Sequence, residues 1–180
     1  MVESIKHGPE NKETAMPPNI ISIVGKSNSG KTTLMVKLIT ELTQRGYKIG
    51  SVKHAHDGFE PDQEGKDSWR HKKAGASASL VMANGKISLV KDDPRPDIER
   101  IQYYHRDMDL ILAEGFKGHP LPKIEIFRVD SPHEHPFCLE DSNLIAFVTD
   151  GDNRPPHVPT FGLEDINAIA SFIEEKIKSD

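Results

Sequence analysis

The segment from Gly25 to Thr32 constrains this chain more than any other, because it has the spacing Gly-x4-Gly-Lys-Thr. Its two glycines let the backbone wrap so that successive N–H groups point inward, which suits a ligand carrying several negative charges. The ammonium group of Lys31 can reach the β- and γ-phosphates of a nucleotide, and the hydroxyl of Thr32 can ligate Mg²⁺. The segment therefore predicts a site for a nucleoside triphosphate with Mg²⁺.

The sequence on either side of this segment provides the context that a phosphate-binding loop needs. A β-branched run at 20–24 predicts a strand that is buried on both faces. Apolar residues at Leu34, Leu38 and Leu42 then share one face of a helix, which Gly46 ends. The segment thus joins a strand to a helix N-terminus, whose dipole favours bound phosphate.

Strands and helices alternate along the rest of the chain. This alternation predicts an α/β protein with the three-layer P-loop NTPase fold, a mostly parallel sheet with helices on both faces. We expect residues 1–18 to form a flexible N-terminal arm and residues 19–180 to form one P-loop nucleotide-binding domain. The expected strands are 47–53, 78–82, 87–90, 109–114, 123–129 and 144–149, the expected helices are 64–75, 97–105 and 164–178, and a rigid connector is expected at 154–159.

The balance of charges argues against general nucleic-acid binding. The 180 residues include 23 lysines and arginines and 28 aspartates and glutamates, a net charge of -5, whereas a binder of the phosphate backbone usually has a basic excess. The one cysteine, Cys138, cannot form an internal disulfide. No apolar run approaches the roughly 20 residues of a membrane span. We therefore expect a cytoplasmic protein with neither a membrane nor a nucleic acid as partner.

A Mg²⁺ site of this kind needs an acidic residue at the end of a neighbouring strand. Glu114 closes the apolar run that begins at Asp109 and is the preferred candidate, although a strand that meets solvent can end in the same way. Asp57 and Asp62 lie in the loop after the second expected strand. They are alternative residues for the metal or for positioning water.

Other polar residues near the expected strand ends have more than one interpretation. Asp150 follows the strand at 144–149, where α/β sheets bind ligands; it could accept hydrogen bonds from N1 and N2 of guanine, and a simple turn explains it equally well. His54 and His56 could share a metal, contact a nucleotide or a partner, or have no special role. Lys26 could reach the phosphates of a partner across a dimer, or it could be a solvated lysine.

Taken together, these motifs resemble the family of molybdopterin-guanine dinucleotide biosynthesis adapter proteins, MobB. The resemblance runs from about Ile20 to Ile177. A phosphate loop alone is shared by a large superfamily, but the combination of motifs is much more specific. The motifs are Gly25-Lys-Ser-Asn-Ser-Gly-Lys-Thr-Thr33, Val52-Lys-His54, Asp62, Gly65-Lys-Asp-Ser68, Ala74-Gly-Ala76, Glu114-Gly-Phe-Lys117, Pro122-Lys-Ile-Glu125 and Arg128.

The resemblance implies a dimeric, cytoplasmic protein that binds GTP with Mg²⁺ and hydrolyses GTP weakly. Such a protein assists a separate molybdopterin guanylyltransferase in attaching GMP to molybdopterin, so GTP, the transferase protein and molybdopterin are the implied partners. From the residues and the resemblance together, we expect catalysis to involve Lys31, Thr32 and Glu114, and the metal to be held by Thr32, Glu114 and Asp62. The residues expected to bind the nucleotide are Gly25, Lys26, Ser27, Asn28, Ser29, Gly30, Lys31, Thr32, Thr33, Lys53, His54 and Asp150.

Two other functions are compatible with a phosphate loop. A metal-insertion GTPase would carry its metal on His54 and His56, but the sequence has no Cys-His cluster. A small-molecule kinase usually closes an arginine-rich lid over the phosphates, and no obvious arginine cluster lies between Arg95 and Arg128 beyond two single arginines. The loop that follows the lysine–histidine pair varies within the family, so the roles of His56 and Asp57 stay open.

Overall fold

A computed structural model describes residues 18–55, 59–132, 135–152 and 154–179 of the chain. The expected arm at 1–18 lies outside the described residues except for its last residue, and His56 and Asp57 lie outside them as well. The helices are α1 (Lys31–Gln44), α2 (Asp67–Lys73), α3 (Asp97–Tyr104) and α4 (Ile166–Ser179). The strands are β1 (Asn19–Val24), β2 (Ile49–Lys53), β3 (Ala78–Ala83), β4 (Lys86–Lys91), β5 (Leu110–Glu114), β6 (Lys123–Phe127), β7 (Leu144–Thr149) and β8 (Thr160–Phe161).

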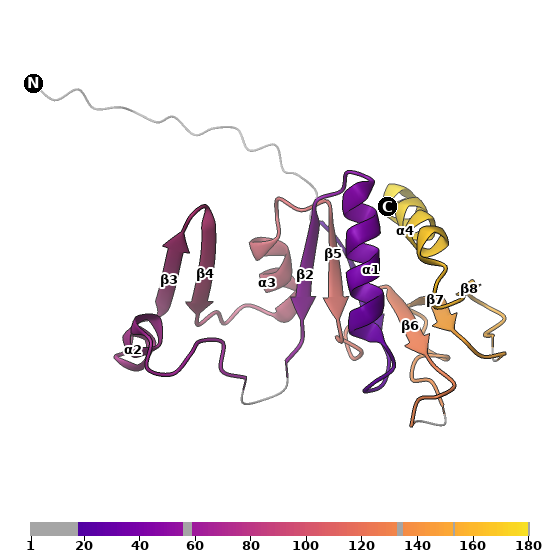
Figure 1. Cartoon of the computed structure of the whole chain (residues 1–180), viewed down its shortest axis with the longest axis horizontal. Coiled ribbons are helices and arrows are strands. Elements are labelled where there is room, and N and C mark those ends of the chain that lie inside the picture. Colours follow the sequence, from indigo (N-terminus) through magenta and orange to yellow (C-terminus); the bar gives the residue numbers. More distant parts are fainter. Residues whose placement is uncertain (1–17, 56–58, 133–134, 153, 180) are drawn as a thin grey trace, which may run out of the picture.

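Six strands form the main sheet in the order β2-β5-β1-β6-β7-β8. Every strand pair of this sheet within the described residues is parallel, so the carboxyl ends of the strands meet at one edge, the lower edge in Figure 1. The two-residue strand β8 was not expected, because it directly follows the proline-rich connector that has no strand pattern. The mostly parallel α/β sheet predicted from the sequence is confirmed.

Helices cover both faces of this sheet. On one face, Ile21 and Ile23 of β1 pack with Leu34 and Leu38 of α1 and with Ile169 of α4. On the other face, a second apolar cluster forms where α3 packs on β1 and β5; its members are Ile20, Ile101, Ile111, Ala113, Phe116 and Leu121. Because alternate residues of a strand face opposite ways, the run at 20–24 supplies both clusters: Ile21 and Ile23 pack on one face and Ile20 on the other. The predicted three-layer arrangement is therefore confirmed.

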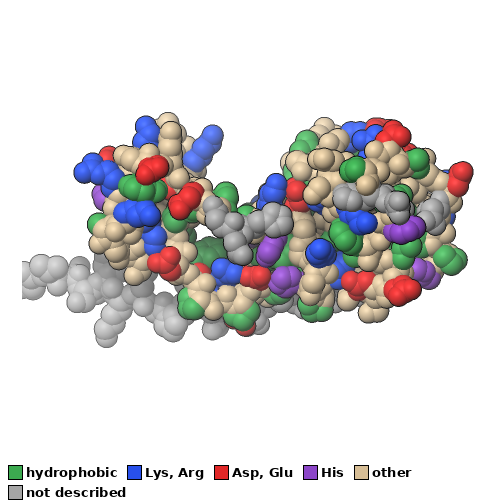
Figure 2. Space-filling model, turned by 90° about the horizontal axis from the view of Figure 1, so that it is seen from below, with side chains coloured by type: hydrophobic (Ala, Val, Ile, Leu, Met, Phe, Trp, Pro, Cys, Tyr) green, Lys and Arg blue, Asp and Glu red, His purple; other side chains and the backbone are tan. Residues whose placement is uncertain are grey.

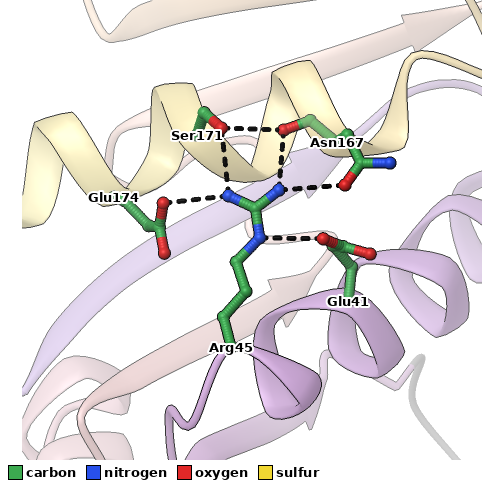
Figure 3. Close-up of polar contacts among 5 residues, drawn as sticks. All are labelled: Glu41, Arg45, Asn167, Ser171 and Glu174. Carbon is green, nitrogen blue, oxygen red and sulfur yellow. Dashed lines mark hydrogen bonds and ion pairs between the residues drawn. The ribbon is translucent and has the colours of Figure 1, made fainter.

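A single arginine joins the ends of the two helices that share the first face (Figure 3). Arg45 follows α1, and its guanidinium donates to the carboxylates of Glu41 at 2.8 Å and Glu174 at 2.9 Å. It also donates to the hydroxyl of Ser171 and to both the carbonyl and the side-chain oxygen of Asn167 on α4. The planar fork of an arginine can make this many bonds at once, so α1 and α4 are held in register on the sheet that carries the phosphate loop.

Strands β3 and β4 form a separate antiparallel hairpin that stands beside the main sheet (Figure 1). Its turn is Asn84-Gly85, and both residues have positive φ angles, 51° and 73°, as a two-residue hairpin turn requires. The two strands and their turn were expected from the sequence. Their isolation from the main sheet was not, because strand pattern alone does not say which strands pair.

No helix within the described ranges combines the length and apolarity needed to cross a membrane.

Candidate nucleotide-binding site

The loop between β1 and α1 depends on two glycines for its shape. Gly30 caps α1 with a φ of 93°, a left-handed conformation that favours glycine, and its carbonyl accepts from the N–H of Leu34 at 2.9 Å. A side chain at Gly25 would place its Cβ 2.5 Å from the carbonyl oxygen of Ile126 and 2.6 Å from the hydroxyl oxygen of Ser29. The two glycines of the motif are therefore needed for the shape of the loop.

Lys31 points its ammonium group back across this loop. Its Nζ donates to the carbonyl oxygen of Lys26 at 2.7 Å. Burial lowers the pKa of Lys31 from its usual value, the neighbouring carboxylate of Glu114 opposes that shift, and the positive charge of Lys53 adds to it. An ammonium held in a partly desolvated loop by one carbonyl gains from an anionic ligand, which would supply stronger, charge-assisted hydrogen bonds.

Ser29 gives a second indication that the loop is built for a ligand. Its side chain is buried, and its hydroxyl has no hydrogen-bond partner within the described part of the chain. A buried polar group without a partner is costly and needs an explanation. A phosphate oxygen in the loop would provide the missing partner, so the loop fits the triphosphate that its sequence predicts.

The predicted acid of the magnesium site lies where the sequence places it. Glu114 ends β5, which pairs with both β1 and β2. Its Oε2 accepts from the hydroxyl of Thr32 at 3.1 Å, and its Oε1 lies 3.6 Å from Nζ of Lys53. A hydroxyl and a carboxylate side by side are suitable oxygen groups for Mg²⁺, which completes its shell with water and phosphate. The described residues contain no group of three or more His, Cys, Asp or Glu side chains able to hold a metal.

The turn after Glu114 is fixed to the strand that leads into the phosphate loop. The N–H of Gly115 donates to the carbonyl of Ile23 at 3.1 Å, and the hydroxyl of Ser22 donates to the carbonyl of Gly115. The next residue, Phe116, has a φ of 57°, a conformation that is unfavourable for a side chain of this size. The end of β5 that carries Glu114 is therefore tied by hydrogen bonds to β1, the strand that leads into the phosphate loop.

The side chains of two other predicted residues make contacts elsewhere, although the backbone N–H of His54 donates to the carbonyl of Glu114 at 3.0 Å. The ring of His54 packs edge-to-face on Phe116, with centroids 5.1 Å apart. Asp62 accepts from the backbone N–H of Gln63 at 2.8 Å, and no contact among the described residues joins it to Thr32 or Glu114. Its predicted role in binding the metal stays a prediction.

The acid predicted to read guanine is already engaged. Asp150 follows β7, and its Oδ1 accepts from the N–H of Val129 at 2.8 Å while its Oδ2 lies 3.6 Å from Nε of Arg128. A guanine base would have to replace these partners. Lys26 extends to another side of the loop, where its ammonium lies 5.0 Å from the ring centroid of Phe137.

Sequence reasoning missed two charged residues inside the sheet. Lys123 and Glu125 of β6 are each only 1% exposed. The Lys123 ammonium donates to the carbonyl of His119 at 2.7 Å and lies 2.9 Å from the Asp141 carboxylate. Glu125 accepts from the backbone N–H groups of residues 137 and 138, and burial raises its pKa. The sequence singled out Lys123 and Glu125 only as part of the motif Pro122-Lys-Ile-Glu125, and their burial was not predicted.

The order of the strands, the phosphate loop and the acid beside Thr32 together define a P-loop NTPase-like α/β protein. Residues 20–150 match the family described as molybdopterin guanine dinucleotide synthesis protein B. A molybdopterin-guanine dinucleotide biosynthesis adapter protein of Haemophilus influenzae is 38% identical over 161 residues, covering 86% of this chain and 87% of that protein. The protein of the same description from Escherichia coli is 32% identical over 161 residues, covering 87% and 91%.

A solved structure supports the same placement. The crystal structure of Bacillus subtilis MobB superposes with a TM-score of 0.71 at 28% sequence identity, covering 90% of this chain and 99% of the other. The chain belongs to the molybdopterin guanine dinucleotide synthesis protein B family. The resemblance drawn from its motifs is confirmed.

Proposed function

We propose that this protein is a GTP-binding adapter with weak GTPase activity, which assists a guanylyltransferase in making the guanine dinucleotide form of the molybdenum cofactor. Membership of the family supports the pathway. The observation that carries the nucleotide role is the convergence of Lys31, Thr32 and Glu114 at one loop, where the buried hydroxyl of Ser29 has no partner among the described residues. No feature of the described residues favours the metal-insertion GTPase or the kinase over the adapter.

The loop residues would act on the phosphates as follows. Lys31 exchanges the carbonyl of Lys26 for oxygens of the β- and γ-phosphates, which are stronger acceptors. The hydroxyl oxygen of Thr32 would ligate the metal, and Glu114 would hold the metal directly or through water. Bound Mg²⁺ would neutralise negative charge on the triphosphate.

Weak hydrolysis is consistent with the surroundings of Glu114. Both of its carboxylate oxygens have a partner, Thr32 on one side and Lys53 on the other. A carboxylate held in this way orients a cation better than it removes a proton from water. This arrangement supports the proposal of a site that binds a triphosphate and turns it over slowly.

Guanine recognition is proposed for Asp150. The end of β7 lies two strands from β1 on the side away from Glu114, so the base and the metal would be on opposite sides of the phosphate loop. The carboxylate would release the Val129 N–H and accept from N1–H and the 2-amino group of guanine. Adenine offers neither donor at that edge, so an unpaired carboxylate would disfavour ATP.

A homodimer is proposed because the β3–β4 hairpin exposes a large apolar surface. Leu80 and Val81 are 50% exposed, Met82 is 70% exposed and Ile87 is 72% exposed. A two-stranded sheet is marginally stable by itself, and both of its edges are unpaired within the described residues. A second copy of the hairpin would cover apolar side chains and edges together. The expected cytoplasmic location stays a prediction.

A nucleotide panel tests the proposed function. Binding of GTP, ATP, GDP and xanthosine triphosphate is measured with Mg²⁺ by calorimetry, and phosphate release is followed in the same samples. We expect GTP to bind most tightly and to turn over slowly whether or not small hydroxyl compounds are added. Preference for ATP, or ADP formation that depends on a hydroxyl substrate, would replace the adapter with a kinase.

A further inference from the structure

A separate cavity opens beside the magnesium end of the phosphate site. It has a volume of about 600 Å³ and lies between the end of β2, the β4 side of the hairpin and helix α3. Lys53 lines it and is also the residue that pairs with Glu114. Figure 2 looks at the edge where the parallel strands end and shows His side chains on the side of the main sheet that faces the hairpin. The cavity and the phosphate loop therefore share one wall.

Flat rings form much of the cavity wall. His54, Phe116, Tyr104 and His105 all line it. His54 and Phe116 pack edge-to-face, so they are held by each other as well as by the sheet. The other lining residues include charged side chains, among them Lys53, Asp97 and Arg100. Cavities of this size with both rings and a few polar groups in the wall typically hold a small organic molecule, and the rings favour a flat heterocycle.

One of the two carboxylates in the wall is free to accept further hydrogen bonds. Asp93 is fully used, because Arg95 and the hydroxyl of Tyr104 bond both of its oxygens. Asp97 has one partner on each oxygen, Arg100 on Oδ1 and His119 on Oδ2 at 3.1 Å. Since a carboxylate has about four acceptor sites, Asp97 retains acceptor capacity. Arg100 first, and also His119, lower the pKa of Asp97, so this carboxylate is ionised at neutral pH.

We propose that this cavity binds the phosphate-bearing pterin of the pathway, with Asp97 accepting from the N3–H and 2-amino donors of the pterin edge. The ring lies among His54, Tyr104 and Phe116, and its phosphate faces Lys53, next to Glu114. Two parallel donors on one edge of a pterin match the two acceptor sites of a carboxylate. The inference rests on the proposed function for the identity of the ligand, since the family name supplies the pterin. The chain then holds the pterin and the nucleotide on adjoining sites.

The test uses 6-hydroxymethylpterin phosphate, whose own fluorescence reports its binding to the full-length protein. We expect saturable binding at one site per chain, and at least tenfold weaker binding to Asp97→Asn, in which an amide donor replaces an acceptor. The matched control is Asp92→Asn, because the exposed carboxylate of Asp92 pairs with Lys72 and does not itself line the cavity; this variant should change the affinity less than twofold. Circular dichroism shows whether both variants fold.

A second measurement needs no variant. The corresponding lumazine phosphate has an oxo group in place of the 2-amino group, so it presents an acceptor to Asp97 and should bind the wild-type protein at least tenfold more weakly. Equal affinity for the two compounds, equal affinity of Asp97→Asn, or no saturation at millimolar pterin phosphate would each overturn the proposal.

GTP titrations in the same samples separate this inference from the proposed function. GTP binding without pterin binding refutes the cavity site alone, and pterin binding without GTP binding refutes the nucleotide role alone.

Discussion

Replacing Asp141 by Asn would test how the buried charge in β6 is stabilised. The carboxylate lies 2.9 Å from Nζ of Lys123, which is 1% exposed. Its other oxygen accepts from both the backbone and the side chain of Asn143, each at 2.9 Å. An amide has one oxygen and one NH₂ group, so in either orientation a donor would face a donor. The substitution therefore leaves a buried ammonium without its counter-ion.

The expected loss in the free energy of unfolding depends on the hydrogen bonds that Lys123 retains in the variant. Removal of one partner from a buried ion pair usually costs about 3–5 kcal/mol. Lys123 retains the carbonyls of His119 and Leu121, and the side chain of Asp141 is 26% exposed, so water can partly compensate. We therefore expect a loss of about 2–3 kcal/mol in the free energy of unfolding at pH 7.

The pH dependence of this loss has a defined sign. Hydrogen bonds from Asn143, followed by the contact with Lys123, lower the pKa of Asp141 in the folded state. The stability from the ionised carboxylate is therefore complete above the unfolded-state pKa of about 3.9. It is lost as the pH falls through the lower folded-state pKa. The difference between wild type and Asp141→Asn should be constant from pH 6 to 8 and shrink below about pH 4.

Urea unfolding followed by circular dichroism across this pH range measures both effects. The control is Asp92→Asn, which breaks an exposed pair with Lys72 and should cost only about 0–1 kcal/mol. A loss at Asp141 no larger than that of the control, or a difference that persists unchanged at pH 3, would refute the role given to the buried pair.

Three further predictions concern the nucleotide and the dimer. Glu114→Gln removes one negative charge, so it should weaken Mg²⁺-dependent GTP binding and leave metal-free GTP binding unchanged or improved. Calorimetry with Mg²⁺ or with EDTA measures both affinities, and a wild-type dependence on Mg²⁺ would assign the metal to another acidic residue. Asp150→Asn should weaken the binding of GTP and favour xanthosine triphosphate, whose 2-oxo group accepts from the new amide. Competition titrations measure the order of affinities, and an order unchanged from the wild type would leave Asp150 as a turn residue only. Ile87→Asp should convert a dimer to monomers without loss of GTP binding, whereas the exposed control Lys86→Asp should leave the dimer intact. Sedimentation velocity measures the oligomeric state, and an unchanged dimer in Ile87→Asp would exclude the hairpin as the interface.

Patterns among neighbouring residues in the sequence were sufficient to predict most of the fold. The strand before Gly25 and the helix after it follow from apolar spacing, and the turn at Asn84-Gly85 follows from the φ angles that those residues tolerate. Glu114 could be placed beside Thr32 because parallel strands end at a common edge. These features depend on neighbouring residues or on a general rule of sheet topology.

The missed features depend on partners distant in sequence. The burial of Lys123 and Glu125 is stabilised by residues 137–141, which no local pattern links to β6. The cavity exists because α3 and the hairpin lie beside the end of β2. Asp150 could be placed at a strand end, but its contact with Val129 depends on the path of the chain after β6.

Calorimetric titration of GTP with Mg²⁺ into the wild type and Lys31→Ala tests the nucleotide role most directly. The variant removes the charge applied to the β- and γ-phosphates, so its affinity should fall at least tenfold, about 1.4 kcal/mol, with an unchanged far-UV spectrum. Lys37→Ala is the control, because Lys37 lies on the same helix and pairs with Glu164 at 2.6 Å rather than with the loop. Wild-type affinity in Lys31→Ala, or no GTP binding by the wild type, would contradict the assignment of the loop as a GTP site.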